Sequence, residues 1–210
     1  MKLLLTSSGI GVKNELLKFI PKPYANTRVA YIITASRVEE DTSYLDKESK
    51  LLRDIGCQVE EMTFENCDQN SARKLLHDID LIYVQGGNSF YLLKILKESG
   101  ADVVIKEMVK KGVPYIGVSA GSYIACPTIE VATWSHQDKN SCGLKDLSAL
   151  AFVPFLISAH YTDEYKEILK QEIAKTNYEV KVLRDDQALL VEDHNIKLVK
   201  DTIPICGGEH

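Results

Sequence analysis

The sequence lacks the cysteine pattern of a disulfide-stabilised or zinc-binding protein. Its cysteines are odd in number and widely spaced, and no two of them form a CxxC pair: Cys57, Cys67, Cys126, Cys142 and Cys206. Disulfide frameworks and structural zinc sites are built from paired, closely spaced cysteines. We therefore expect reduced, mostly buried thiols and no metal site.

Long hydrophobic runs and an excess of positive charge are also absent. No apolar segment approaches the roughly 18 to 20 residues that cross a bilayer, and the apolar part of residues 1–9 is too short for a signal peptide. The net charge is -5, because 25 Lys and Arg stand against 30 Asp and Glu. No bulk positive field is therefore available to attract nucleic-acid phosphates. These absences predict a cytoplasmic protein that binds neither membranes nor nucleic acid.

The sequence does contain short apolar segments that alternate with amphipathic ones. Its 210 residues fit one domain, 1–210. Apolar and β-branched runs predict strands at 3–6, 28–34, 57–62, 79–84, 113–118, 180–183 and 188–191. Apolar residues at helical spacing predict helices at 41–55, 90–98, 101–111 and 163–176, and a further helix capped by Ser71. This alternation is typical of βαβ units, so we expect an α/β fold with a mostly parallel sheet that is covered on both faces. In such folds the functional site lies beyond the carboxyl ends of the strands.

A candidate nucleophile follows the strand expected at 113–118. Residues 117–121 fit the pattern G-x-S-x-G, whose small residues allow a sharp turn from strand to helix that exposes the serine hydroxyl of Ser119. The amide of the next residue, Ala120, would lie at the start of a helix, where the helix dipole favours a developing oxyanion. By itself the pattern also occurs by chance, as a tight turn with an ordinary capping serine.

A second glycine turn follows the strand expected at 79–84. Residues 85–88 read Gln-Gly-Gly-Asn, and adjacent glycines let backbone amides approach a ligand closely, so Gly87 is a candidate second oxyanion donor. A purely structural turn is the alternative. Together, the segments 85–90, 117–122 and 127–129 resemble peptidase family S51, which includes peptidase E and cyanophycinase. The resemblance covers most of the chain and implies a three-layer α/β sandwich of the class I glutamine amidotransferase type.

A serine nucleophile needs a general base, usually a histidine within hydrogen-bond reach. His77 on a surface helix, His194 in a turn and the terminal His210 are most simply solvated, which leaves His136 and His160. His160 follows an apolar segment at the expected end of a strand, where sites collect in such folds. The resemblance also implies a histidine in a similar strand-end context. His160 is therefore the candidate general base, and a packed structural histidine is the alternative.

The carboxylate that would orient His160 has several candidates. The aspartate that peptidase E carries beyond its serine aligns with Trp134 in this sequence. Asp138 and Glu130 lie nearby, whereas Asp185 resembles the position of the cyanophycinase glutamate. A carboxylate at a late strand end can accept the imidazole N–H and stabilise the imidazolium. We favour Asp185 as the catalytic acid, with a solvated turn residue as the alternative.

Candidate substrate contacts are Asn88, Ser89 and Tyr161, because they flank the proposed oxyanion donor and base, although each also suits capping or turns. The resemblance implies cleavage after an N-terminal aspartate, and reading that carboxylate calls for a well-placed Arg or Lys. The segment 163–176 contains no arginine, where peptidase E has arginines. The sequence therefore does not favour aspartate specificity. Loops such as 135–141 would have to supply any substrate-binding lid.

The leading hypothesis is a serine hydrolase that cleaves small peptides without a metal or organic cofactor and that is a monomer or homodimer. A cysteine-based relative would need another nucleophile turn, because Cys126 lies seven residues beyond Ser119. A nucleotide-binding protein would need a phosphate-binding glycine motif, which the sequence lacks. A catalytically silent protein that binds a small ligand, with the serine turn but without the acid, is the remaining alternative.

Overall fold

The centre of the molecule is a seven-stranded sheet with the strand order β3-β2-β4-β5-β1-β8-β9. The computed structural model describes residues 1–134, 138–193 and 195–201. The strands of the sheet are β1 (Lys2–Thr6), β2 (Arg28–Ile32), β3 (Gln58–Met62), β4 (Leu81–Val84), β5 (Tyr115–Val118), β8 (Gln187–Glu192) and β9 (Asn195–Lys200). The first five strands pair in parallel, whereas β8 and β9 add to β1 as an antiparallel edge. The expected α/β class and mostly parallel sheet are confirmed.

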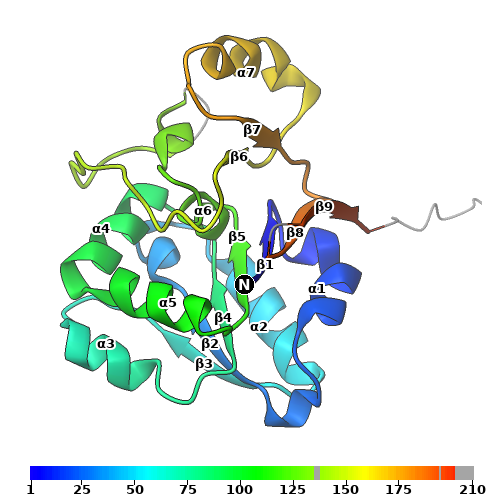
Figure 1. Cartoon of the computed structure of the whole chain (residues 1–210), viewed down its shortest axis with the longest axis vertical. Coiled ribbons are helices and arrows are strands. Elements are labelled where there is room, and N and C mark those ends of the chain that lie inside the picture. Colours follow the sequence, from blue (N-terminus) through cyan, green and yellow to red (C-terminus); the bar gives the residue numbers. More distant parts are fainter. Residues whose placement is uncertain (135–137, 194, 202–210) are drawn as a thin grey trace, which may run out of the picture.

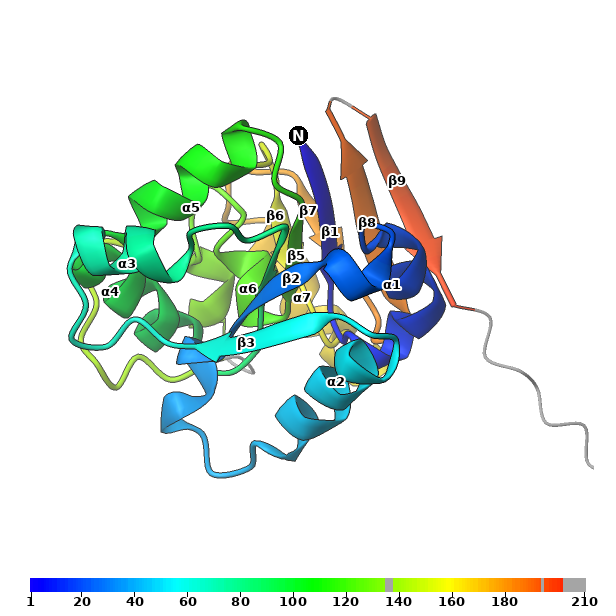
Figure 2. The same cartoon turned by 90° about the horizontal axis from the view of Figure 1, so that it is seen from below.

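Helices cover both faces of this sheet (Figure 2). On one side lie α1 (Lys13–Phe19) and α2 (Ser43–Asp54); on the other lie α3 (Gln69–Leu75), α4 (Ser89–Ser99) and α5 (Ala101–Lys110). Successive strand residues alternate between two hydrophobic clusters: Tyr31 of β2 belongs to the cluster that includes Leu16 and Leu52, and Ile32 belongs to the cluster that includes Leu92. Both faces of the central strands β1, β2, β4 and β5 are buried, so these strands need continuous apolar runs, which explains their pattern in the sequence. The result is a three-layer sandwich.

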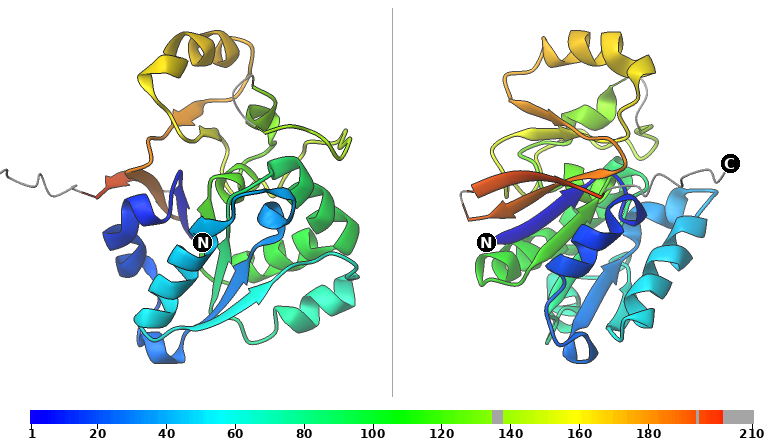
Figure 3. Two further views of the ribbon diagram at one scale, coloured as in Figure 1. Left: turned by 180° about the vertical axis from the view of Figure 1, so that it is seen from behind. Right: turned by 90° about the vertical axis from the view of Figure 1, so that its right-hand side faces the viewer.

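A smaller two-stranded parallel sheet lies beyond the end of the main one (Figures 1 and 3). It consists of β6 (Leu156–Ser158) and β7 (Val180–Val182), and α7 (Lys166–Ile173) connects the two strands. Leu156, Leu169 and Leu183 belong to the same hydrophobic cluster as Ile82 of the main sheet. The small sheet is therefore packed firmly onto the main one. None of the helices in the described ranges is long and apolar enough to cross a bilayer.

The element boundaries differ from the expectation in several places. The cap of α3 is Asp68, whose side chain accepts a hydrogen bond from the Ser71 amide, so the expectation of a Ser71 cap is wrong. The helix expected over 163–176 begins as a 3-10 turn and is regular only over Lys166–Ile173. Strand β9 was not predicted, because Val199 is its only buried residue and its apolar signal is weak. The short helix α1 was also not predicted.

Candidate active site

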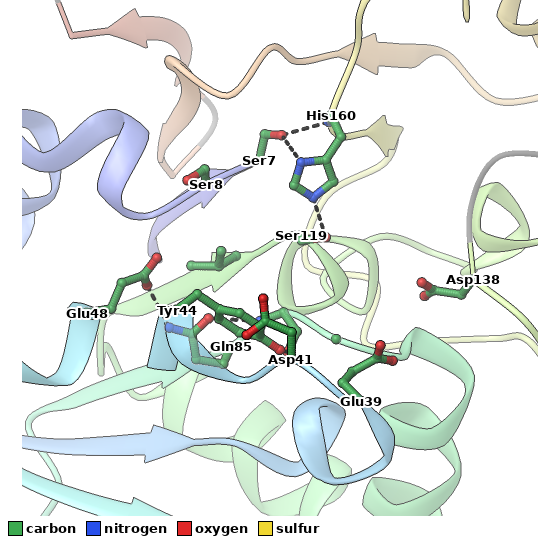
Figure 4. Close-up of a pocket in the computed structure, with 13 residues that line it drawn as sticks. Ser7, Ser8, Glu39, Asp41, Tyr44, Glu48, Gln85, Ser119, Asp138 and His160 are labelled. Atoms are coloured by element: carbon green, nitrogen blue, oxygen red, sulfur yellow. Dashed lines mark hydrogen bonds between the residues drawn. The ribbon is translucent and has the colours of Figure 1, made fainter. Parts of the chain in front are cut away.

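Three neighbouring strands, β4, β5 and β1, end at the same edge of the main sheet, and a cavity of about 460 Å³ opens there. Ser7 follows β1, Gly86 and Gly87 follow β4, and Ser119 follows β5; all four line the cavity. His160, from the loop after β6, closes it from the side of the small sheet (Figure 4). The topology thus gathers at one edge groups that are far apart in the sequence, as is usual for parallel sheets.

Ser119 lies in the sharp turn between β5 and the short helix α6 (Ala120–Tyr123). Its backbone is in a strained conformation, with φ 49° and ψ -108°, and its amide donates to the carbonyl of Thr6 on β1. A β-carbon at Gly121 would lie 2.2 Å from the carbonyl oxygen of Val84, so only glycine allows α6 to approach β4 this closely. The G-x-S-x-G pattern therefore has a packing reason in this chain.

His160 also has a positive φ, 58°, and its ring is oriented by hydrogen bonds at both nitrogens. Nε2 lies 2.9 Å from the hydroxyl oxygen of Ser119, and Nδ1 lies 2.8 Å from Oδ1 of Asp185. With the proton on Nδ1, the ring donates to Asp185 and leaves Nε2 free to accept the hydroxyl proton of Ser119. Serine, histidine and carboxylate thus form one hydrogen-bonded series, the arrangement of a catalytic triad.

Asp185 lies in the loop between β7 and β8, and its carboxylate is held by two groups. The hydrogen bond with His160 lowers the pKa of Asp185, and the hydrogen bond from Ser7 acts in the same direction, while partial burial opposes both. The side chain keeps 63% of its surface exposed. Asp185 is therefore ionised at neutral pH, as an acid that stabilises an imidazolium must be.

Ser7 is a site residue that the sequence did not single out. It is fully buried, its hydroxyl donates to Oδ1 of Asp185 at 2.6 Å, and its oxygen accepts from the backbone amide of His160 at 2.7 Å. One hydroxyl therefore links the histidine loop to the acid. A signal was present, because Ser7 directly follows an apolar strand and polar residues at such positions face the site. Which strand lies next to β5 was not readable from the sequence.

The two candidate oxyanion donors are the backbone amides of Gly87, which follows β4, and Ala120, which follows Ser119. Gly87 lines the cavity with φ +122°, and a β-carbon there would meet the Ala35 carbonyl at 2.5 Å. The amide of Asn88, which donates to the same carbonyl, and the hydroxyl of Ser36, which donates to the Gly86 carbonyl, hold this loop in place. No described residue accepts a hydrogen bond from the Gly87 amide. Ala120 begins α6, so its amide has no acceptor within the helix.

The three candidate substrate contacts lie outside the wall of the Ser119 cavity. Asn88 caps α4 through its side-chain oxygen and donates to the Lys139 carbonyl. Ser89 is buried in the first turn of α4, and its amide donates to Asp138. The ring of Tyr161 stacks on the guanidinium of Arg184 at 4.8 Å. The capping alternative accounts for Asn88, and a substrate role for any of the three stays a prediction.

The other acids and histidines have different surroundings. Asp138 lines the cavity but accepts from the Ser89 amide, and Glu130 accepts from the hydroxyl of Thr176. Neither makes a hydrogen bond with His160 in the described part of the chain. Trp134 is buried, and His77 is exposed beside an aspartate. Residues 135–137, 194 and 202–210 lie outside the described residues, and with them His136, His194, His210, Cys206 and part of the lid expected at 135–141.

Fold and site together define a class of protein: an α/β sandwich with a serine, a histidine and an aspartate in hydrogen-bonded series at the carboxyl edge of its sheet, as in serine hydrolases. The family model of peptidase family S51 matches residues 3–199, and the chain belongs to this family. It is therefore a serine-type peptidase by family, and the resemblance noted in the sequence is confirmed.

Several relatives are similar over most of their length. An uncharacterized peptidase of Listeria monocytogenes is 36% identical over 82% of this chain and 84% of its own length. An uncharacterized peptidase of Pasteurella multocida is 30% identical over 100% of this chain and 98% of its own. The crystal structure of a candidate peptidase E protein from Listeria monocytogenes superimposes with a TM-score of 0.86 and 31% identity, covering 96% of this chain and 98% of that one.

Proposed function

We propose that the protein hydrolyses peptide bonds of small peptides, with Ser119 as nucleophile, His160 as general base and Asp185 as the acid that orients the histidine. The observation that carries this proposal is the continuous series from the serine hydroxyl through the imidazole to the carboxylate, with contacts of 2.9 and 2.8 Å. The open cavity beside Ser119 leaves room for a short peptide. Family membership supports the same chemistry.

The reaction follows from the positions of these groups. Ser119 Oγ attacks the scissile carbonyl carbon while Nε2 of His160 takes the hydroxyl proton, and the amides of Gly87 and Ala120 stabilise the oxyanion. When the tetrahedral intermediate collapses, the C–N bond breaks and His160 returns the proton to the leaving amine. Water then attacks the acyl-enzyme, again through His160, and releases the carboxylic acid product with free Ser119.

Ser7 is proposed as a positioning residue rather than a catalytic one. It does not contact Ser119, but its hydroxyl links the Asp185 carboxylate to the His160 backbone. The backbone of His160 has a positive φ, which is unfavourable for a residue other than glycine, so the loop needs tertiary contacts to keep this conformation. A hydrogen bond from a buried, rigid strand end therefore helps to define where the imidazole lies.

A serine-directed fluorophosphonate tests this proposal independently of substrate specificity. We expect wild-type protein to be labelled at Ser119, and we expect Ser119→Ala to abolish labelling and His160→Ala to reduce it strongly. Ser71→Ala, which changes an exposed serine on α3, is the matched control and should label as wild type. Failure of the wild type to label, together with no hydrolysis of an N-terminal dipeptide library, would favour the catalytically silent binding protein instead.

A further inference from the structure

In the part of the chain that the structure describes, the cavity beside Ser119 is lined by no lysine or arginine but by four carboxyl groups: Glu39, Asp41, Glu48 and Asp138. Glu39 and Asp41 lie in the segment between β2 and α2, and Asp138, from a different part of the chain, lies near Glu39 at the same cavity (Figure 4). Among the described residues, His160 is the only basic side chain in the wall. Such a cavity has a negative potential at the place where substrate must bind.

Glu48 has a structural role and does not need a ligand. It is 4% exposed, and it accepts hydrogen bonds from the Tyr83 hydroxyl, the Gln85 side chain and the backbone amide of Ile10. Burial raises the pKa of Glu48, which favours its neutral form. The charge that a substrate meets therefore comes from the other three carboxylates.

Glu39, Asp41 and Asp138 form no ion pair among the described residues, although Lys139 lines the adjoining cavity that all three share. Asp138 accepts one hydrogen bond through Oδ2, from the Ser89 amide. Burial raises the pKa of Asp138, and burial together with nearby Asp138 and Glu40 raises the pKa of Glu39. A cation placed beside Glu39 and Asp138 would relieve their repulsion and offset their desolvation. Asp41 is exposed, and the hydrogen bond from the Ser43 amide lowers its pKa, so it adds a charged carboxylate at the same place.

We propose that the substrate carries a cationic group, an ammonium or guanidinium, which binds Glu39, Asp41 and Asp138 while the scissile carbonyl lies at Ser119. The inference rests on the proposed function, because the serine and histidine identify this cavity as the place where substrate binds. An aspartate side chain in the same place would be repelled. The cavity is therefore suited to the opposite charge from an aspartyl substrate, in agreement with the shortage of arginine in the sequence.

The cation has two chemical sources: the free α-ammonium of a short peptide, or the side chain of a lysine or arginine. Binding of four tetrapeptides to the Ser119→Ala variant, measured by calorimetry, separates them without needing turnover. The peptides are Ala-Ala-Ala-Ala with a free N-terminus, its N-acetyl form, and N-acetyl forms with lysine or aspartate at the second position. Hydrolysis of the same peptides by wild-type protein is measured in parallel.

We expect at least one cationic peptide to bind about tenfold more tightly than the acetylated neutral peptide, with the aspartate peptide binding weakest. Preference for the free N-terminus assigns the cation to the α-ammonium, and preference for the acetylated lysine peptide assigns it to a side chain. Introducing Glu39→Gln and Asp138→Asn together into the Ser119→Ala variant should remove most of the preference for the cationic peptide. Added salt should weaken the same preference. Glu98→Gln removes the same charge from an exposed position on α4, outside this cavity and the adjoining one, and should leave the preference nearly unchanged.

Equal or tighter binding of the neutral or aspartate peptide, no binding by any peptide, or a preference that survives the double substitution overturns this proposal. The proposed hydrolase function is judged separately, by fluorophosphonate labelling of Ser119 in the wild type. Labelling without a preference for cations leaves the hydrolase in place and removes the substrate assignment. A preference for cationic peptides without labelling or turnover supports the cation site but contradicts the hydrolase function.

Discussion

Asp185 is the residue whose position was hardest to foresee and whose charge matters most for the proposed chemistry. Its carboxylate accepts from both His160 and Ser7. We predict that Asp185→Asn lowers kcat about 10⁴-fold, because a neutral amide neither stabilises the imidazolium nor selects the productive tautomer. Steady-state hydrolysis measures the loss. Asp138→Asn is the comparison, and a larger fall in kcat for that variant would assign the acid to Asp138 instead.

Ser7 holds the Asp185 carboxylate and the His160 loop in fixed positions relative to each other through hydrogen bonds to both. We predict that Ser7→Ala lowers kcat by about tenfold and leaves KM nearly unchanged, because the hydrogen bonds to Asp185 and from the His160 amide are lost away from the substrate. Steady-state kinetics with a saturable peptide gives both constants. An equal loss after Asp185→Asn and after Asp185→Asn with Ser7→Ala would show that Ser7 acts through Asp185. A further full loss in the double variant would contradict that role.

The partly buried carboxyl group of Asp138 makes the stability of the folded protein depend on pH. Burial raises its pKa in the folded protein above the unfolded value, so the stability contribution of its proton is fully present at low pH and is lost as pH rises through the folded pKa. Asp138→Asn keeps an oxygen for the Ser89 amide but removes the charge. We predict a higher melting temperature than wild type at neutral pH, with the difference shrinking below about pH 4. A variant that is less stable at neutral pH would contradict this assignment.

At the scale of elements, the turn between β5 and α6 depends on how closely the helix approaches β4. We predict that Gly121→Ala destabilises the protein by about 1–3 kcal/mol, the usual cost of overpacking, because the new methyl group would lie 2.2 Å from the Val84 carbonyl oxygen. Urea denaturation measures the change in unfolding free energy. At Gly112 no atom lies within 4 Å of an added β-carbon, so Gly112→Ala reports the cost of its positive φ alone. A smaller effect at Gly121 than at Gly112 would contradict the packing argument.

Helices and strands could be predicted where their buried residues form a recognisable apolar pattern in the sequence. The parallel strands β1, β2, β4 and β5 are almost entirely buried and have clear apolar runs, whereas β9 lies at an edge with one buried residue and was missed. The pairing of β6 with β7 was also not readable, because strand neighbours are set by long-range packing. His160 was correctly expected at a strand end, but this strand belongs to the small sheet rather than the main one.

At the scale of the whole molecule, the small sheet and the main sheet share one hydrophobic cluster, which includes Trp134. We propose that the chain unfolds as one cooperative unit, as the expectation of a single domain requires. We predict that Trp134, the only tryptophan, reports the same urea transition by fluorescence as the whole backbone does by circular dichroism. A fluorescence transition at clearly lower urea concentration would indicate that the small sheet opens first. The expected cytoplasmic location and monomeric or dimeric state stay predictions.

The sequence by itself determined the local chemistry of this protein. Glycine spacing around Ser119 and at 85–88, together with the apolar runs before them, identified two turns at strand ends, because such turns depend on neighbouring residues alone. Only the tertiary structure decided which acid meets His160 and that Ser7 joins it, since Ser7 and Asp185 are separated by 178 positions along the chain. The acidic wall of the cavity arises in the same way, from loops that only the folded sheet brings to one edge.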